Sequence, residues 1–136
     1  MKYSFKQTKD FEHLLVLDKK AFPADTRQDF SQDAACWLIV DENGKSVGFC
    51  SIELMPNNTA FLSRAAVFGK KNQGLHKRAI KCRIKWAKAI GIKKIITYTS
   101  HWNFKSIANL IKCGFLFYEP KDKYAGKNAF YFQKRI

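Results

Sequence analysis

A strand, a short polar loop and a long helix follow one another between Phe61 and Ile90, and this succession constrains the chain more than any other feature. Strand-forming residues run as far as Val67. Gly74 then opens an amphipathic helix, and Gly91 is a natural stop after it. A glycine lets a ligand approach the backbone closely. The first N–H groups of a helix have no partner within the helix, and they point out of its N-terminal end. The arrangement therefore predicts a site for an anion such as a pyrophosphate.

The composition indicates one ordinary globular domain. The 136 residues are 46% hydrophobic and include 12 Phe, 5 Tyr and 3 Trp, which is enough apolar material for a sizeable core. We expect a single domain over residues 1–136. No apolar run approaches the roughly 20 residues that span a bilayer, and the N-terminal segment has no apolar core of signal-peptide length. We therefore expect a cytoplasmic protein that does not contact a membrane.

The cysteines give no sign of a metal centre or a disulfide framework. Cys36, Cys50, Cys82 and Cys113 are widely separated and lie among apolar neighbours. They form neither a CxxC pair nor a cluster with histidine, so no metal site is expected. We interpret them as buried free thiols in a reducing compartment.

The positive charge of the chain indicates an anionic partner. The formal net charge is +14, which favours a nucleic acid, a ribosome or an acidic protein as a binding partner. A charge that serves solubility alone is an equally open interpretation. The sequence does not distinguish a monomer from a homodimer.

Local patterns predict an α+β protein built on a mixed α/β sheet. Strands are expected at 2–6, 36–40, 46–54, 60–67, 94–99, 115–118 and 128–134. Helices are expected from a Thr8 cap to about Lys20, within 24–33, at 74–90 and at 105–112. The resulting order is β-α-α-β-β-β-α-β-α-β-β.

The helix at 74–90 has an apolar face and a basic face. The residues expected to face the core are Leu75, Ala79, Cys82, Trp86 and Ile90, and those expected to face water are Lys77, Lys81, Lys85 and Lys88.

A second motif follows the strand at 94–99. Asn103 and Ser106 stand at the start of the next helix, and Gly114-Phe115 ends it. The first motif reads Lys71-Asn72-Gln73-Gly74-Leu75-His76. Together, in this order and on these elements, the two motifs resemble the GNAT family of N-acetyltransferases, and the weaker resemblance extends over the whole chain. It implies a single domain whose central, mostly antiparallel, twisted sheet is flanked by helices.

The resemblance also implies acetyl-CoA as the acetyl donor. The cofactor-binding residues that it implies are Ala66, Val67, Phe68, Lys71, Asn72, Gln73, Gly74, Leu75, His76, Lys77, Arg78, Asn103 and Ser106. The loop at 71–76 would hold the pyrophosphate, and Asn103 would bond the pantetheine arm. Asn103 and Ser106 can also serve simply as helix caps. Two positions depart from the family pattern, because Lys71 stands where Arg or Gln is usual and His76 where a small residue is usual.

The implied reaction is direct transfer of the acetyl group to an amine of an unidentified small molecule or protein. Backbone N–H groups near Val67 and Phe68 would polarise the thioester carbonyl. Strands splayed near 65–67 and 97–99 would admit the pantetheine. An amine attacks only when it is neutral, so a base or a water path must remove its proton.

The sequence identifies no catalytic residue. Glu53 is a candidate base, although a solvated strand glutamate is the simpler interpretation. The tyrosine acid usual in the second motif is replaced by Leu110, and Tyr98, Ser100, Tyr118 or water are the candidate substitutes. We interpret the histidine at 101 as a loop residue and Trp86 as a core residue. Acceptor contacts are expected at 22–25, Arg27 and Tyr124.

Two alternatives stay open. One is a catalytically degraded GNAT-fold binding protein. The other is a small basic nucleic-acid-binding module, favoured by the charge, the basic helix face and aromatic residues such as Trp102 and Phe104. No helix-turn-helix, RNP or zinc-finger signature accompanies them.

Overall fold

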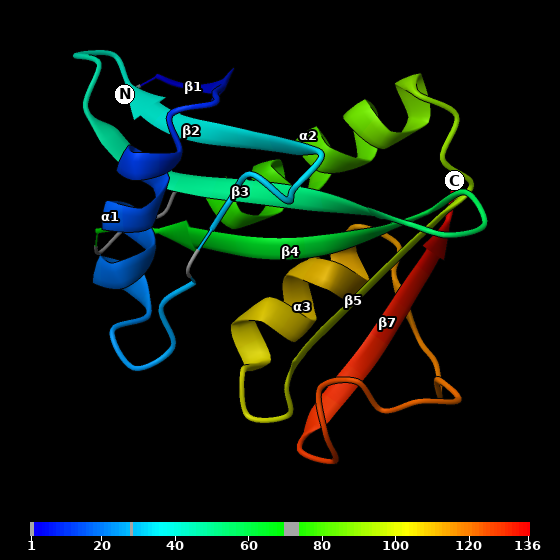
Figure 1. Ribbon diagram of the computed structural model, residues 1–136. Helices are drawn as coiled ribbons and strands as arrows, with labels where there is room; N and C mark the ends of the chain where they lie inside the picture. The colour runs from blue at the N-terminus through cyan, green and yellow to red at the C-terminus, as the bar shows by residue number, and fades with distance from the viewer. Residues whose placement is uncertain (1, 28, 70–73) are drawn as a thin grey trace.

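Figure 1 shows a computed structural model of the chain, in which residues 2–27, 29–69 and 74–136 are described. The elements are β1 (Tyr3–Gln7), α1 (Phe11–Ala21), β2 (Ala35–Asp41), β3 (Ser46–Met55), β4 (Thr59–Val67), α2 (Leu75–Ala89), β5 (Lys94–Ser100), α3 (Phe104–Lys112), β6 (Leu116–Phe117) and β7 (Ala129–Arg135). These elements confirm the α+β class and every predicted strand.

The strands form one sheet in the order β1-β2-β3-β4-β5-β7-β6. Each neighbouring pair among the described residues is antiparallel except β4 and β5, which run parallel. A parallel pair needs a crossover, and α2 supplies it. The sheet is therefore mostly antiparallel, as expected.

Helices cover both faces of the sheet. Apolar residues of α2 and α3, such as Ala79 and Leu110, pack with Trp37 and Ile39 of β2 in the larger core cluster. Those of α1 pack on the opposite face, where Cys36 belongs to a second cluster. The two clusters take alternate residues of β2, as the two-residue period of a strand requires. The central strands are thus buried on both sides.

The two parallel strands separate part-way along their length. Pairing between β4 and β5 ends at Phe61 and Ile96, although both strands continue beyond that point. The Thr97 hydroxyl donates to the carbonyl of Leu62 at 3.1 Å, just past the last pair. Figure 1 shows the strands close together near one end and diverging toward the other. The predicted splay between these strands is confirmed.

The second helix expected within 24–33 is not formed by the described residues of that segment, which adopt turns and bends. Side chains there bind the backbone N–H groups that a helix would use. The Arg27 N–H donates to the Asp18 carboxylate at 2.8 Å, and the Ser31 N–H donates to Asp29 at 2.8 Å. Such bonds from side chains to backbone N–H groups compete with helix formation. The segment is anchored instead by Phe30, which is fully buried.

The first helix starts later than the Thr8 cap predicted. Asp10 is the N-cap of α1 and accepts from the His13 N–H at 3.2 Å. Thr8 instead accepts from the Asp10 N–H at 3.0 Å, which shapes the turn before the helix.

The buried face of α2 is rotated from the one predicted. Ile80, Arg83, Ile84 and Ala87 are buried with Leu75 and Ala79. Ile90 is 49% exposed, which contradicts its assignment to the core face. Trp86 lies at the margin, half-buried, and meets Trp37 edge to face with ring centroids 6.0 Å apart. The rotation brings Arg83 into the interior.

Candidate functional site

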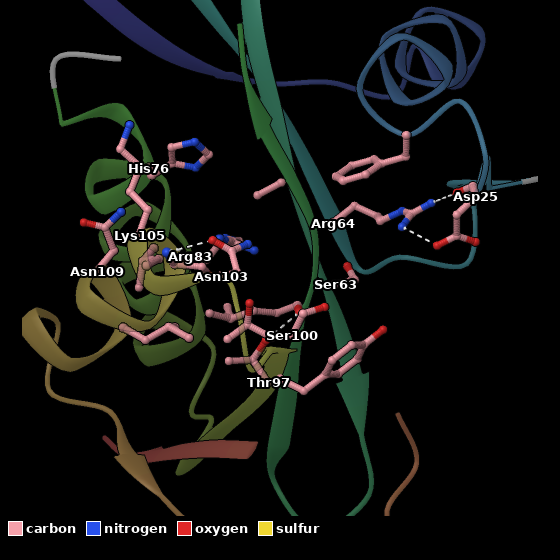
Figure 2. A pocket seen from close by; sticks show the side chains of 18 residues that line it. Asp25, Ser63, Arg64, His76, Arg83, Thr97, Ser100, Asn103, Lys105 and Asn109 are labelled. Atoms are coloured by element: carbon pink, nitrogen blue, oxygen red, sulfur yellow. Dashed lines mark hydrogen bonds and ion pairs between the residues drawn. The ribbon is translucent and has the colours of Figure 1, made fainter. Parts of the chain in front are cut away.

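A cavity of about 450 Å³ opens where β4 and β5 separate. Its walls come from β4, β5, α2, α3 and the segment after α1, and its lining residues are Phe22, Asp25, Leu62, Ser63, Arg64, Ala65, His76, Ile80, Arg83, Thr97, Tyr98, Thr99, Ser100, Asn103, Lys105, Ser106, Asn109 and Leu110. In Figure 2 the labelled residues of α2 and α3 lie on one side of β4, and Arg64 and Asp25 lie on the other. The lining of the cavity therefore comes from both sides of β4.

A bulge in β4 forms part of the cavity wall. Cys50 lies opposite Ala65 and Ile52 opposite Leu62, so β4 holds one residue more than β3 over this stretch. Ser51, which is fully buried, stabilises the bulge. Its hydroxyl accepts from the Arg64 N–H at 3.1 Å. Ser63, Arg64 and Ala65, at the bulge, line the cavity.

The N-terminus of α2 lies at one end of this region. Gly74 precedes the helix with φ 73°, in the left-handed region where glycine is favoured. Glycine at the N-cap has no side chain of its own to cap the helix, and no acidic residue stands in the first turn. The helix dipole therefore adds to the positive potential of nearby cations.

The third helix contributes polar side chains and one apolar one. The Asn103 side chain accepts from the Ser106 N–H at 3.2 Å, which makes Asn103 the N-cap of α3. Both residues also line the cavity, and so does Leu110 one turn further on. The capping role and the cavity position are compatible, because the cap uses only the oxygen of the Asn103 amide.

Arg83 is the most deeply buried charged group of the site, with 3% of its surface exposed. Its guanidinium donates to the carbonyl of Ala79 at 3.0 Å and to that of Ser51 at 3.1 Å. No carboxylate of the described residues forms an ion pair with it. Burial lowers the pKa of Arg83, yet an arginine side chain stays protonated at neutral pH. The interior of the cavity therefore carries an uncompensated positive charge.

The opposite wall is a network of paired charges. Arg64 lies 3.1 Å from Asp18 and 3.2 Å from Asp25, and its guanidinium stacks over the ring of Phe22 at 4.5 Å. Asp18 is fully buried on α1. The network fastens α1 and the segment after it to the β4 bulge.

His76 projects from the first turn of α2 into the same cavity. Burial, with smaller effects from Lys105 and Arg83, lowers its pKa. The imidazole is therefore neutral at pH 7, and it can donate or accept a hydrogen bond without adding charge.

The predicted cofactor-binding residues divide into three groups. His76, Asn103 and Ser106 line the cavity. Lys71, Asn72 and Gln73 lie outside the described residues, and Gly74 adjoins them. The remaining residues, Ala66, Val67, Phe68, Leu75, Lys77 and Arg78, do not line it.

Two of these placements have clear causes. The Phe68 N–H donates to the carbonyl of Val47 at 2.8 Å, so it is not available to polarise a thioester carbonyl, and the expectation is wrong for Phe68. The bulge at 63–65 brings β4 backbone to the cavity instead. Arg78 is turned toward β1, where it donates to the Tyr3 carbonyl at 3.2 Å and lies over the ring of Phe5.

The candidate acid–base residues are also separated by the structure. Tyr98 and Ser100 line the cavity, whereas Glu53 and Tyr118 do not. Burial, with the nearby carboxylate of Asp33, raises the pKa of Glu53. It remains a candidate base only through intervening water. A further acceptor contact expected from sequence, Tyr124, packs against Tyr98 with ring centroids 5.9 Å apart.

The histidine at 101 has a structural role in a surface cluster. Its ring lies 3.1 Å from the Asn128 carbonyl and contacts Trp102 and Phe130. Cys113 is buried beneath α2, and burial raises the pKa of its thiol. Neither residue lines the cavity. No group of three metal-ligating side chains occurs in the described part of the chain, and none of its helices is long and apolar enough to cross a membrane.

Comparisons with known proteins identify the family. The model of the acetyltransferase (GNAT) family matches residues 5–115, which is most of the chain and includes both sequence motifs. This chain belongs to the GNAT acetyltransferase family. Membership confirms the acyltransferase class inferred from the motifs.

Solved structures of GNAT acetyltransferases share the fold. The chain is similar to an IAA acetyltransferase from Bacillus cereus, with a TM-score of 0.81 and 14% identity over 99% of this chain and 100% of that one. It is also similar to the ribosomal-protein-S18-alanine N-acetyltransferase from Escherichia coli, with a TM-score of 0.79 and 17% identity over 99% and 94%. A Bacillus subtilis acetyltransferase solved in complex with CoA matches with a TM-score of 0.78 and 16% identity over 99% of each chain. The comparison with curated proteins finds no match.

Proposed function

We propose that this GNAT protein is an acetyl-CoA-dependent N-acetyltransferase that transfers the acetyl group directly to an amine. The observation that carries the proposal is the cavity between β4 and β5, which begins where their pairing ends at Phe61 and Ile96. Residues of α2, α3, both strands and the segment after α1 line it, so its lining comes from both sides of β4. An elongated thioester entering from one side could meet an amine entering from the other.

The charge of the cavity suits the donor. On the side of α2 and α3, its charged lining residues are the cations Arg83 and Lys105, and His76 is neutral. Among the described residues that line the cavity, Asp25 is the only acid, and its carboxylate lies 3.2 Å from the Arg64 guanidinium. A polyanionic donor is favoured by such a field.

The described residues suggest how the donor would lie. Its pyrophosphate would bind at the N-terminus of α2, next to Gly74. Its pantetheine arm would pass Asn103 and Ser106, and its thioester would reach the β4 bulge at Ser63–Ala65. The acceptor would enter past Arg64 and Tyr98.

Holding donor and acceptor together supplies much of the expected rate enhancement. The amine nitrogen must be neutral when it bonds to the carbonyl carbon, so its proton passes first to water or, through water, to Glu53. The acceptor is an amine of a small molecule or a protein. At 14–17% identity, the acceptors named for the similar proteins do not identify the acceptor of this chain.

The surface charge supports a second part of the proposal, which is that the protein contacts an anionic partner. Lys81, Lys85 and Lys88 are exposed along α2, and the chain has a net charge of +14. We assign this surface to contact with an anionic partner, such as a nucleoprotein, in the cytoplasm. Its interactions would weaken steeply with added salt.

An assay with labelled donor tests the activity. The protein is incubated with acetyl-CoA carrying a labelled acetyl group and with pools of small amines, peptides and ribosomal protein, and labelled amides are detected by mass spectrometry. Transfer to at least one pool is expected, and it should be lost in Gly74→Glu. Gly91→Glu is the matched control, because Gly91 also has a positive φ and open space around it but lies at the other end of α2. If labelled acetate is released but no labelled amide forms in any of the pools, the proposal is contradicted.

A further inference from the structure

The buried arginine of the cavity has no role in the family resemblance, and its surroundings suggest one. Arg83 is 3% exposed, and its hydrogen bonds to the described residues go to backbone carbonyls rather than to a carboxylate. Burying a cation without a counter-ion is unfavourable, so such an arginine in a cavity is a candidate for binding an anion. The question is which anion the guanidinium meets.

The position of Arg83 along α2 excludes the pyrophosphate. Arg83 lies nine residues beyond Gly74, which is about 13 Å along a helix. The pyrophosphate site is at the start of that helix, so Arg83 faces a later part of the donor.

The contacts of Arg83 locate it at the β4 bulge. Its guanidinium binds the carbonyl of Ser51, whose hydroxyl lies 2.7 Å from that of Ser63 and accepts from the Arg64 N–H. Under the proposed function, the thioester lies at this bulge. Figure 2 shows Arg83 beside the strand that carries Ser63, on the same side as Asn103.

The absence of a proton donor at position 110 completes the argument. Leu110 lines the cavity and is 4% exposed, and it cannot protonate a leaving thiolate. A buried cation stabilises such an anion without transferring a proton.

We propose that Arg83 is a catalytic residue whose guanidinium stabilises the negative charge that develops on the thioester and remains on the departing CoA sulfur. In this step the amine nitrogen bonds to the carbonyl carbon, and the carbon–sulfur bond breaks with its electron pair left on sulfur. The amine proton passes to water. The products are the amide, the CoA thiolate and a proton, so no general acid is required. This inference rests on the proposed function.

The ionisation of bound CoA tests the inference without knowledge of the acceptor. The ultraviolet absorbance of a thiolate is followed against pH for the CoA complex, and the same titration of the desulfo-CoA complex is subtracted to remove the contribution of the four protein cysteines. A free thiol has a pKa of about 8.5, and an adjacent cation lowers it by about one to three units. The wild-type complex should show this lowering.

Three variants separate the roles of Arg83. Arg83→Met should return the thiol pKa of bound CoA to its free value while desulfo-CoA still binds, and Arg83→Lys should retain part of the lowering. Lys81→Met, which removes an exposed charge from the same helix, should leave the pKa unchanged.

Each contrary result has a distinct meaning. An unperturbed thiol in the wild-type complex would overturn the inference and leave the proposed function intact. Equal loss of CoA and desulfo-CoA binding in Arg83→Met would also overturn it, because the arginine would then only shape the cavity. Arg83-dependent preference for succinyl-CoA over acetyl-CoA would show that the arginine binds an acyl carboxylate instead. Failure of the wild type to bind either CoA or desulfo-CoA would refute the proposed function itself.

Discussion

The hydroxyl oxygen of Ser51 lies 2.7 Å from that of Ser63, across the point where β4 holds one residue more than β3. The same hydroxyl accepts from the Arg64 N–H, and the carbonyl of Ser51 accepts from Arg83. One buried serine thus joins the bulge in the strand, the arginine of α2 and the cavity between them. The shape of the site depends on this residue.

Replacing Ser51 by alanine should destabilise the protein by about 1–3 kcal/mol, because the Arg64 N–H loses its buried acceptor. The free energy of unfolding in urea measures the loss. Ser63→Ala is the matched control, since it removes only the hydroxyl–hydroxyl bond and leaves the Arg64 N–H satisfied. Equal losses in the two variants would show that Ser51 does not stabilise the bulge.

Two acidic partners of Arg64 should differ sharply in their contribution to stability. Asp18 is buried and also accepts from the Arg27 N–H, whereas the Asp25 side chain is 87% exposed. Asp18→Ala should cost about 3–5 kcal/mol, because it leaves a partly buried guanidinium without its main partner. Asp25→Ala should cost less than about 1 kcal/mol. Comparable shifts of the denaturation midpoints would contradict the assignment of Asp18 as the anchor of α1.

The neutral His76 should make stability depend on pH. Its pKa is lowered in the folded protein, so below about pH 6.5 the unfolded chain binds the proton more readily. The contribution of the neutral His76 to stability is therefore fully present above about pH 6.5, and it is lost as the pH falls through the folded-state pKa. Denaturation at a series of pH values should show a smaller slope in His76→Gln. An unchanged slope would show that His76 is not buried as a neutral group.

Position 110 offers a test of how the leaving group is stabilised. Leu110→Tyr introduces a phenol at the position where the family resemblance implies a tyrosine acid, and general acids typically contribute about 10²–10⁴-fold in rate. If Arg83 already stabilises the thiolate, the substitution should change the rate of acetyl transfer little in the wild type. It should restore much of the activity lost in Arg83→Met. Equal stimulation in both backgrounds, measured as kcat with the acceptor found by the labelled screen, would argue against a charge-stabilising arginine.

Strong local signals made most of the fold predictable from the sequence. The Asn43-Gly44 hairpin, the glycine before α2 and the Gly114-Phe115 end of α3 fixed the order of elements. The segment 24–33 was predicted wrongly because its turns depend on the buried carboxylate of Asp18, nine residues before Arg27. Local propensity does not report such a contact.

The predicted site was less complete, for two reasons. The bulge depends on the pairing of β4 with β3, so the cavity is lined by Ser63 to Ala65 rather than by residues 66–68. The sequence pattern did not indicate Arg83, because the apolar face that it predicts for the helix includes Trp86 and Ile90. The alternative spacing of Ile80, Ile84 and Ala87 places Arg83 inside, and that spacing was present in the sequence.

Calorimetric titration with acetyl-CoA tests the central claim most directly. We expect binding at one site per chain, weaker binding of dephospho-CoA, loss of binding in Gly74→Glu and its retention in Gly91→Glu. No heat of binding at millimolar acetyl-CoA, or equal effects of the two glycine variants, would show that the cavity between β4 and β5 does not hold the donor.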